Sequence, residues 1–197
     1  MSFSPSAGDD VPLPLGATNS AGPPPARNIE LKARLRSLDA ARATAARLAT
    51  HHVGLETQID TYFVCRHGRL KLRQINGTRA QLVWYARSDR RDAKASDYRL
   101  VEVAEAELLK QALAAAWGTL VVVEKRREIY LYHNVRIHLD EVAELGVFIE
   151  FEAVLGSGVD DAAGRAQVAW LQGEFQIAPT DLLEGSYSDL LQKKTKC

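Results

Sequence analysis

The chain has 197 residues and a mass of 21.7 kDa, with 46% hydrophobic and 25% charged residues, which is typical of one globular domain with a substantial core. Its 25 basic and 25 acidic residues cancel, so no overall field draws it to nucleic acid or to a membrane. Its two cysteines offer neither a disulfide framework nor metal-ligand spacing, and its N-terminus lacks a signal-peptide pattern. We expect a cytoplasmic protein, monomeric or homodimeric, with no nucleic-acid or membrane partner.

Residues 1–26 are rich in Pro, Ser, Gly and Ala and contain no Lys or Arg. Such a segment buries too little apolar surface to offset the entropy lost on ordering, so we expect a disordered leader. The composition changes abruptly at Arg27. Residues 27–197 are expected to form a single domain.

Period-two alternation of polar and apolar residues predicts about eight strands. In chain order they cover residues 28–35, 55–63, 69–73, 79–87, 97–103, 119–132, 135–140 and 147–153. Helical spacing predicts helices at residues 37–50, 105–117 and 159–171, and a broken helix at 179–191. Ser37 can cap the first helix, the Asn76-Gly77 pair predicts a hairpin turn, and the polar residues 88–96 are expected to form a mobile loop.

The predicted helices fall at the ends of the strand series rather than between every pair of strands. This order favours a mostly antiparallel α+β architecture. A sheet with one strongly charged face would have to close or curl around that face.

The hairpin from Val135 to Val154 carries an unusual polar face. Glu150 and Glu152 share a face on its second strand, and Asp140 lies on the polar face of the first. Like charges so placed repel unless a cation lies between them, and hard divalent cations prefer carboxylate oxygens. From this hairpin alone, an ordinary solvated sheet face is slightly the better interpretation.

Five predicted strands repeat this segregation of charge. Their polar faces supply the cations Lys32, Arg34, Arg69, Lys71, Arg73, Lys125, Arg127 and Arg136 and the acids Glu30, Asp140, Glu150 and Glu152. Buried and unpaired, such charges would be strongly destabilising, whereas a polyphosphate with divalent cations satisfies both signs. The alternative is a set of outward faces whose exposed ion pairs contribute under about 1 kcal/mol each. Repetition over five strands favours a channel for a triphosphate-bearing small molecule.

Several segments resemble the CYTH superfamily, also called triphosphate tunnel metalloenzymes, in their order and spacing. They are NIELK at 28–32, LKLR at 70–73, EKRREIY at 124–130, RIHLDEV with LGVFIEFE at 136–152, and GSYSDLL at 185–191. The similarity covers nearly everything from Arg27 onward and is strongest to the class IV adenylate cyclase-like branch. It implies a closed eight-stranded antiparallel β-barrel with helices packed outside, which binds a triphosphate together with Mg²⁺ or Mn²⁺.

The resemblance also implies three groups of site residues, position by position. The metal ligands would be Glu30, Asp140, Glu150 and Glu152. The substrate-binding cations would be Lys71, Arg73, Lys125, Arg127 and Arg136. The catalytic residues would be Lys32, Arg136 and Asp140.

Two residues depart from the family pattern. Asn28 stands where the first glutamate of the ExExK signature is expected, which removes one charge from the metal cluster. Tyr85 stands where many members have a tunnel lysine. His138 shares the predicted polar face with Arg136, and either contact with a base or phosphate or a structural hydrogen bond would fit it.

Three activities remain open from the sequence. Cations, acids and metal without an obvious nucleophile suit phosphoryl chemistry, in which positioning and charge neutralisation supply most of the catalysis. Hydrolysis of a triphosphate (nucleotide, thiamine or inorganic) is slightly favoured over cyclisation of ATP to cyclic AMP, because cyclisation also needs a purine pocket. The third is a catalytically weak module that binds nucleotides or polyphosphates, which Asn28 and Tyr85 suggest.

Overall fold

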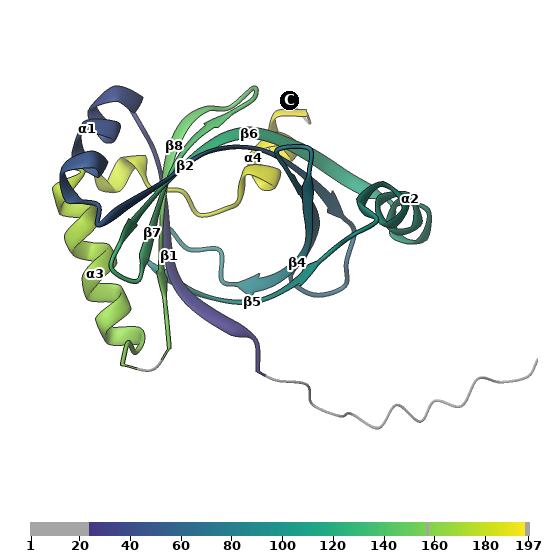
Figure 1. Cartoon of the computed structure of the whole chain (residues 1–197), viewed down its shortest axis with the longest axis horizontal. Helices are drawn as coiled ribbons and strands as arrows, with labels where there is room; N and C mark the ends of the chain where they lie inside the picture. Colours follow the sequence, from purple (N-terminus) through teal and green to yellow (C-terminus); the bar gives the residue numbers. More distant parts are fainter. Residues whose placement is uncertain (1–23, 157, 196–197) are drawn as a thin grey trace, which may run out of the picture.

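A closed barrel of eight antiparallel strands makes up most of the computed structural model, which describes residues 24–156 and 158–195. Figure 1 shows the ring of strands and the helices outside it. The expected fold class is confirmed. The expected leader lies outside the described residues as far as residue 23, and the first strand already begins at Ala26. The division into a leader and one domain stays a prediction.

The strands are β1 (Ala26–Arg34), β2 (His51–Phe63), β3 (Arg69–Ile75), β4 (Arg79–Arg87), β5 (Lys94–Glu102), β6 (Thr119–Tyr132), β7 (Val135–Val142) and β8 (Gly146–Val154). The helices are α1 (Leu38–Leu48), α2 (Ala106–Trp117), α3 (Asp161–Glu174) and α4 (Tyr187–Thr195), with a short 3-10 helix η1 at Pro179–Asp181. Around the barrel the order is β1-β5-β4-β3-β2-β6-β7-β8. Hairpin neighbours supply most pairings, and three long-range pairings, β1 with β5, β1 with β8 and β2 with β6, close the ring.

Local signals in the sequence form the turns and caps as expected. The Ser37 side chain accepts a hydrogen bond from the Ala40 amide and starts α1. Asn76 and Gly77 both have positive φ, 51° and 67°, in the three-residue turn that joins β3 to β4.

The predicted loop at residues 88–96 ends earlier than expected, because β5 begins at Lys94. The Lys94 ammonium is buried and donates to the main-chain oxygens of Arg90, Leu183 and Glu184 at 2.6–3.3 Å. Burial, together with repulsion from Arg87, lowers the pKa of Lys94 to about 8. A polar stretch therefore joins the sheet through contacts with the distant C-terminal segment, which no local pattern reveals.

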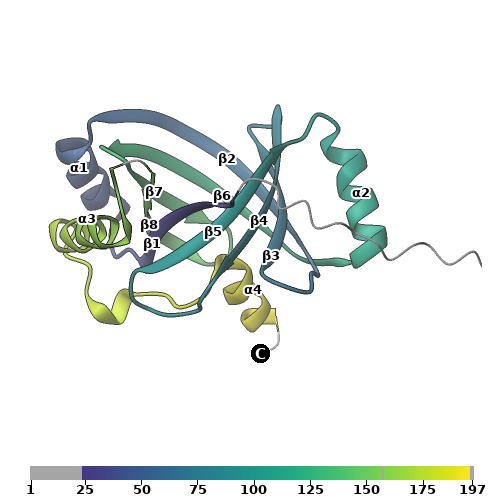
Figure 2. The ribbon, with the colours of Figure 1, turned by 90° about the horizontal axis from the view of Figure 1, so that it is seen from below.

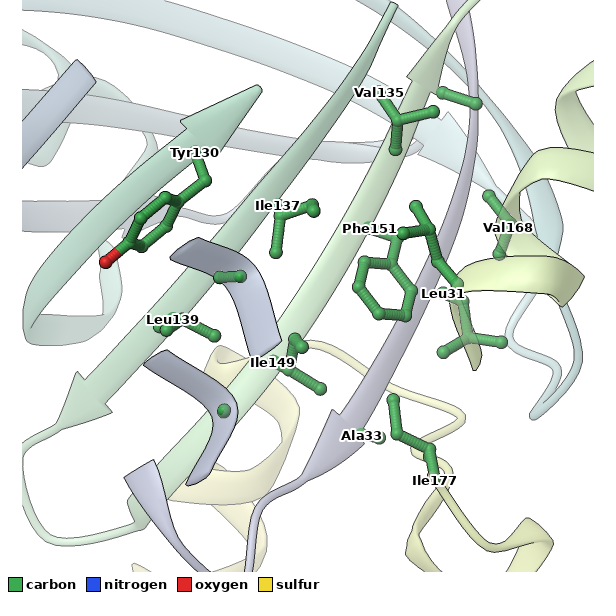
Figure 3. Close-up of a cluster of buried hydrophobic side chains, with 14 of the residues drawn as sticks. Leu31, Ala33, Tyr130, Val135, Ile137, Leu139, Ile149, Phe151, Val168 and Ile177 are labelled. Carbon is green, nitrogen blue, oxygen red and sulfur yellow. The ribbon is translucent and has the colours of Figure 1, made fainter. Parts of the chain in front are cut away.

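The main hydrophobic core lies outside the barrel, between the strands and the helices α1 and α3 (Figure 3). Its members include Leu31 of β1, Ile149 and Phe151 of β8, Val168 of α3 and Ala45 of α1. On the other side, α2 covers a smaller cluster on β2, β3 and β4 (Figure 2). Because the apolar residues face the helices, the alternate polar residues of the same strands face the barrel interior.

The pairing register arranges the interior charges in rows. Lys32 on β1 lies opposite Glu150 on β8, which lies opposite His138 on β7. In the next row, Glu30 lies opposite Glu152. A slip of one residue would send these charges to the helix-covered face, so burial of the apolar face enforces the register.

Candidate functional site: a charged cavity inside the barrel

The barrel interior holds a cavity of about 120 Å³ whose lining includes residues from every strand. Ser186 and Tyr187, where α4 begins, also line it. Its charged side chains are Lys32, Lys71, Arg73, Arg87, Lys125, Arg127 and Arg136, and the acids Glu30, Asp60, Glu150 and Glu152. All site residues expected from the sequence line this cavity except Asp140. Arg34 and Arg69 do not line it either, since Arg34 donates to the Leu145 carbonyl and Arg69 pairs with aspartates outside.

Asp60 on β2 holds three of the cations together. It is 1% exposed and accepts hydrogen bonds from Lys71 at 2.9 Å and from Lys125 at 2.7 Å. The Nε and Nη2 atoms of Arg73 also donate to it, at 2.7 and 2.9 Å. Burial raises the pKa of Asp60, but Arg73, Lys125 and Lys71 outweigh it and hold that pKa well below its ordinary value. Asp60 is not among the site residues expected from the sequence, although it alternates with Gln58 and Tyr62 on the polar face of β2. The result is a preformed cluster of three cations, which are donors of the kind that suits phosphate oxygens.

Glu150 on β8 is the second centre of the site. Its carboxylate accepts from Lys32 at 2.6 Å and from Arg127 at 2.7 Å, and it lies 3.3 Å from His138 Nδ1. Burial raises the pKa of Glu150, but Lys32 and Arg127 outweigh it and hold that pKa well below its ordinary value. Glu150 is therefore ionised over the physiological range.

Asp140 lies behind Arg127 rather than at the cavity. It is fully buried, and its two oxygens accept from Arg127 at 2.7 and 2.6 Å and from the Tyr187 hydroxyl at 2.7 Å. Burial raises the pKa of Asp140, but Arg127 outweighs it and brings that pKa to about 2. This geometry suits a group that orients Arg127 and anchors α4 at one end of the barrel (Figure 2).

Arg87 on β4 is a second residue that sequence reasoning missed. Its guanidinium pairs with Glu30, and its Nε has no partner among the described residues, although the side chain is only 2% exposed. Burial raises the pKa of Glu30, against the opposing effect of Arg87. Tyr85 lies two residues earlier on the same face, where a lysine was expected, so Arg87 supplies a cation close to the missing one.

A divalent cation fits the acids at one side of the cavity. His138, Glu150 and Glu152 offer ligand atoms within 4.8 Å of one another, the one such group in the described part of the chain. Among the described residues, the one ion pair of Glu152 is with Arg136, at 3.5 Å. Asn28 Oδ1 lines the same cavity, is buried and has no hydrogen-bond partner among residues 24–156 and 158–195. Orphaned and carboxylate oxygens of this kind are the donors that hard cations prefer.

A closed antiparallel barrel with cations and acids sorted inside it defines a class of proteins built to hold polyphosphates. The family model of the CYTH domain matches residues 26–187, and the chain belongs to this family. Its members are generally metal-dependent triphosphatases or cyclases that act on triphosphates.

Solved structures share the fold at low identity. The PH1012 protein of Pyrococcus horikoshii is 24% identical with a TM-score of 0.74, over 83% of this chain and 98% of that one. A candidate adenylate cyclase of Vibrio parahaemolyticus is 18% identical with a TM-score of 0.68, over 84% and 97%. A Hippeastrum protein described with a dominant triphosphatase activity is 14% identical with a TM-score of 0.60, over 86% and 96%. No curated protein matches the chain.

Within the described residues, no helix combines the length and apolar character needed to span a bilayer. The expected cytoplasmic location, the monomeric or homodimeric state and the absence of a nucleic-acid partner stay predictions.

Lys71 should make polyphosphate binding depend on pH. Burial, together with repulsion from Arg73, lowers the pKa of Lys71 to about 8 in the free protein. Bound phosphate favours the protonated ammonium, so the contribution of Lys71 to the affinity should be full below pH 8 and should fall as the pH rises through 8, by at most about tenfold per unit.

Calorimetry with inorganic triphosphate, in buffers of different ionisation enthalpy, measures the proton uptake at pH 8. Lys71→Arg should bind but take up fewer protons, because its guanidinium stays charged. Protonation of the ligand itself is common to both proteins. Equal uptake in both would contradict the assignment.

Proposed function

We propose that this protein is a divalent-metal-dependent triphosphatase that holds its substrate inside the barrel. The observation that carries the proposal is the meeting, in one cavity, of the Asp60-centred cations with the acids Glu150 and Glu152. The first group matches phosphate oxygens and the second matches the metal that accompanies them. The Hippeastrum protein, described as a dominant triphosphatase, supports hydrolysis over cyclisation.

In this proposal different cations bind different parts of the substrate. Phosphate oxygens on the β3 and β6 side are bound by Lys71, Arg73 and Lys125, which Asp60 on β2 holds in position. Further phosphate contacts come from Arg87 on β4 and Arg136 on β7.

Lys32 and Arg127 lie nearest the acids, where charge builds up on the phosphoryl group that is transferred. Two contacts position the Lys32 ammonium: it donates to Glu150 Oε1 at 2.6 Å, and it lies 4.0 Å from the centre of the Tyr187 ring. Asp140 orients Arg127 in place of binding metal, since it contacts Arg127 and Tyr187 behind the cavity and does not line it.

Glu150 and Glu152 would hold a Mg²⁺ or Mn²⁺ ion, joined by Glu30 when substrate draws Arg87 away. A bound divalent ion would neutralise phosphate charge and make water a better nucleophile. Glu150 does not need to change its protonation state for this role, because its cationic neighbours hold it ionised.

Cyclisation of ATP is the second candidate, and a specific feature favours it. Val83, Tyr85, Tyr98 and Leu100 form an apolar and aromatic side of the cavity on β4 and β5. A purine could lie against such a surface while the phosphates reach the cations.

One assay separates these activities. The protein is incubated with ATP, thiamine triphosphate or inorganic triphosphate and with Mg²⁺ or Mn²⁺, and the products are identified by chromatography. Orthophosphate supports the triphosphatase, and cyclic AMP supports the cyclase. Binding of all three without any product would overturn both and leave a polyphosphate-binding module.

Asn28→Glu should tighten metal binding and lower the Mg²⁺ or Mn²⁺ concentration that gives half-maximal activity. Asn28 lines the cavity two residues before Glu30, so the change restores a carboxylate beside the acids. Without metal, the added charge should lower the melting temperature by a few degrees. Thermal melts with and without metal, beside a metal titration of activity, measure both effects. If neither changes, Asn28 lies outside the metal cluster.

A further inference from the structure

His138 has no role in the function proposed above, yet it lies among the acids. It is 4% exposed on the inner face of β7, and its Nδ1 is 3.3 Å from Glu150 Oε2. Its ligand atoms and those of Glu150 and Glu152 all lie within 4.8 Å of one another. Two ligands that bind one ion at about 2.1–2.4 Å each are separated by roughly 3–4.8 Å, so this spacing suits a shared ion.

The other acids in the barrel are less available for this position. Asp140 and Glu30 lie outside the group within 4.8 Å; Asp140 contacts Arg127 and Tyr187, and Glu30 is paired with Arg87. Two residues before Glu30 on the inner face of β1 is Asn28, whose buried Oδ1 has no hydrogen-bond partner among the described residues. An ion here would meet two carboxylates, and the third donor of the group within 4.8 Å is an imidazole nitrogen.

We infer that His138 is a metal ligand and that it biases the site toward first-row transition ions, such as Mn²⁺ and Co²⁺, over Mg²⁺. Magnesium demands oxygen ligands and keeps several waters, whereas imidazole binds transition ions with an affinity that rises from Mn²⁺ to Co²⁺. His138 Nδ1 and Glu150 Oε2 lie 3.3 Å apart, and as ligands of one ion they would both bind it without a proton between them. The inference rests on the proposed function only in assuming that this cavity takes a divalent cation.

The test uses the full chain and metal alone, so it does not depend on turnover. Calorimetric titrations with Mn²⁺, Co²⁺ and Mg²⁺ give the three affinities, and pulsed electron paramagnetic resonance of the Mn²⁺ complex detects a directly bonded nitrogen. We expect Mn²⁺ to bind roughly tenfold more tightly than Mg²⁺, Co²⁺ to bind more tightly still, and nitrogen coupling to appear in the wild-type spectrum.

His138→Gln should abolish the nitrogen coupling and reduce the preference for Mn²⁺ over Mg²⁺ severalfold, with Mg²⁺ affinity nearly unchanged. His51→Gln is the matched control, since His51 is exposed at the start of β2, and it should leave every value as in the wild type. If His138→Gln fails to fold, the wild-type spectrum still decides whether a nitrogen is bonded to the ion.

Mn²⁺ binding without nitrogen coupling, or with equal affinities for Mn²⁺ and Mg²⁺, would overturn the role of His138 and leave the proposed triphosphatase standing on its carboxylates. Nitrogen coupling in a protein that hydrolyses no triphosphate would support the ligand and sink the proposed function. A protein that binds none of the three ions would overturn the inference.

Discussion

Asp60→Asn should lower the free energy of unfolding of the ligand-free protein by about 3–5 kcal/mol at pH 6. The amide keeps the shape of the side chain but removes the negative charge that Lys71, Arg73 and Lys125 share in a buried site. No negative charge then offsets the repulsion among the three cations. At pH 9 the loss should be smaller, because Lys71 and Lys125, whose pKa values burial already lowers, can lose their protons and relieve the repulsion.

Inorganic triphosphate should restore much of this loss, because its oxygens replace the missing carboxylate as partner for the three cations. The rise in melting temperature on adding the ligand should therefore be larger for Asp60→Asn than for the wild type. Asp97→Asn removes an exposed partner of Arg27 and should change stability by under about 1 kcal/mol. Denaturant titrations at both pH values measure the effect. A loss below about 1 kcal/mol at pH 6 would show that Asp60 is not the counter-charge of this cluster.

Glu150→Gln should reduce metal-dependent turnover by about 10²-fold or more, while triphosphate binding survives in part. The amide brings no negative charge to the metal, and it also weakens the hold on Lys32 and Arg127. Because this variant disturbs two buried ion pairs, its melting temperature should fall as well.

Glu152→Gln separates loss of metal from loss of fold. Within the described part of the chain Glu152 forms one ion pair, with Arg136 at 3.5 Å, so its replacement should abolish metal-dependent turnover with little change in melting temperature. Glu124→Gln is the control, since Glu124 is exposed on β6 and should tolerate the change. Steady-state kinetics with Mg²⁺ and Mn²⁺ measure all three. Full activity in both Glu150→Gln and Glu152→Gln would mean that the acids serve only as partners for the cations.

The alternation of the sequence was enough to place most of the charged residues inside the barrel. Side chains in a strand alternate between its two faces, so once Ile137 and Ile149 pack under the helices, Arg136 and Glu150 must face the interior. Hairpin signals such as Asn76-Gly77 are equally local. The eight-stranded antiparallel barrel followed from such patterns and from the resemblance to known tunnel proteins.

Tertiary structure alone decided which charges meet. Arg87 pairs with Glu30 across a gap of 57 residues, because β5 lies between β4 and β1 in the closed ring. Lys125 reaches Asp60 across 65 residues, through the pairing of β2 with β6. Asp140 lies on the polar face of its strand, as Glu150 does on the next, yet Arg127 and Tyr187 contact its oxygens behind the cavity. The period of a strand determines the face on which a side chain lies. Which residues that side chain contacts depends on the closure of the ring and on the helix at one end of it. No local stretch of the sequence determines either of these.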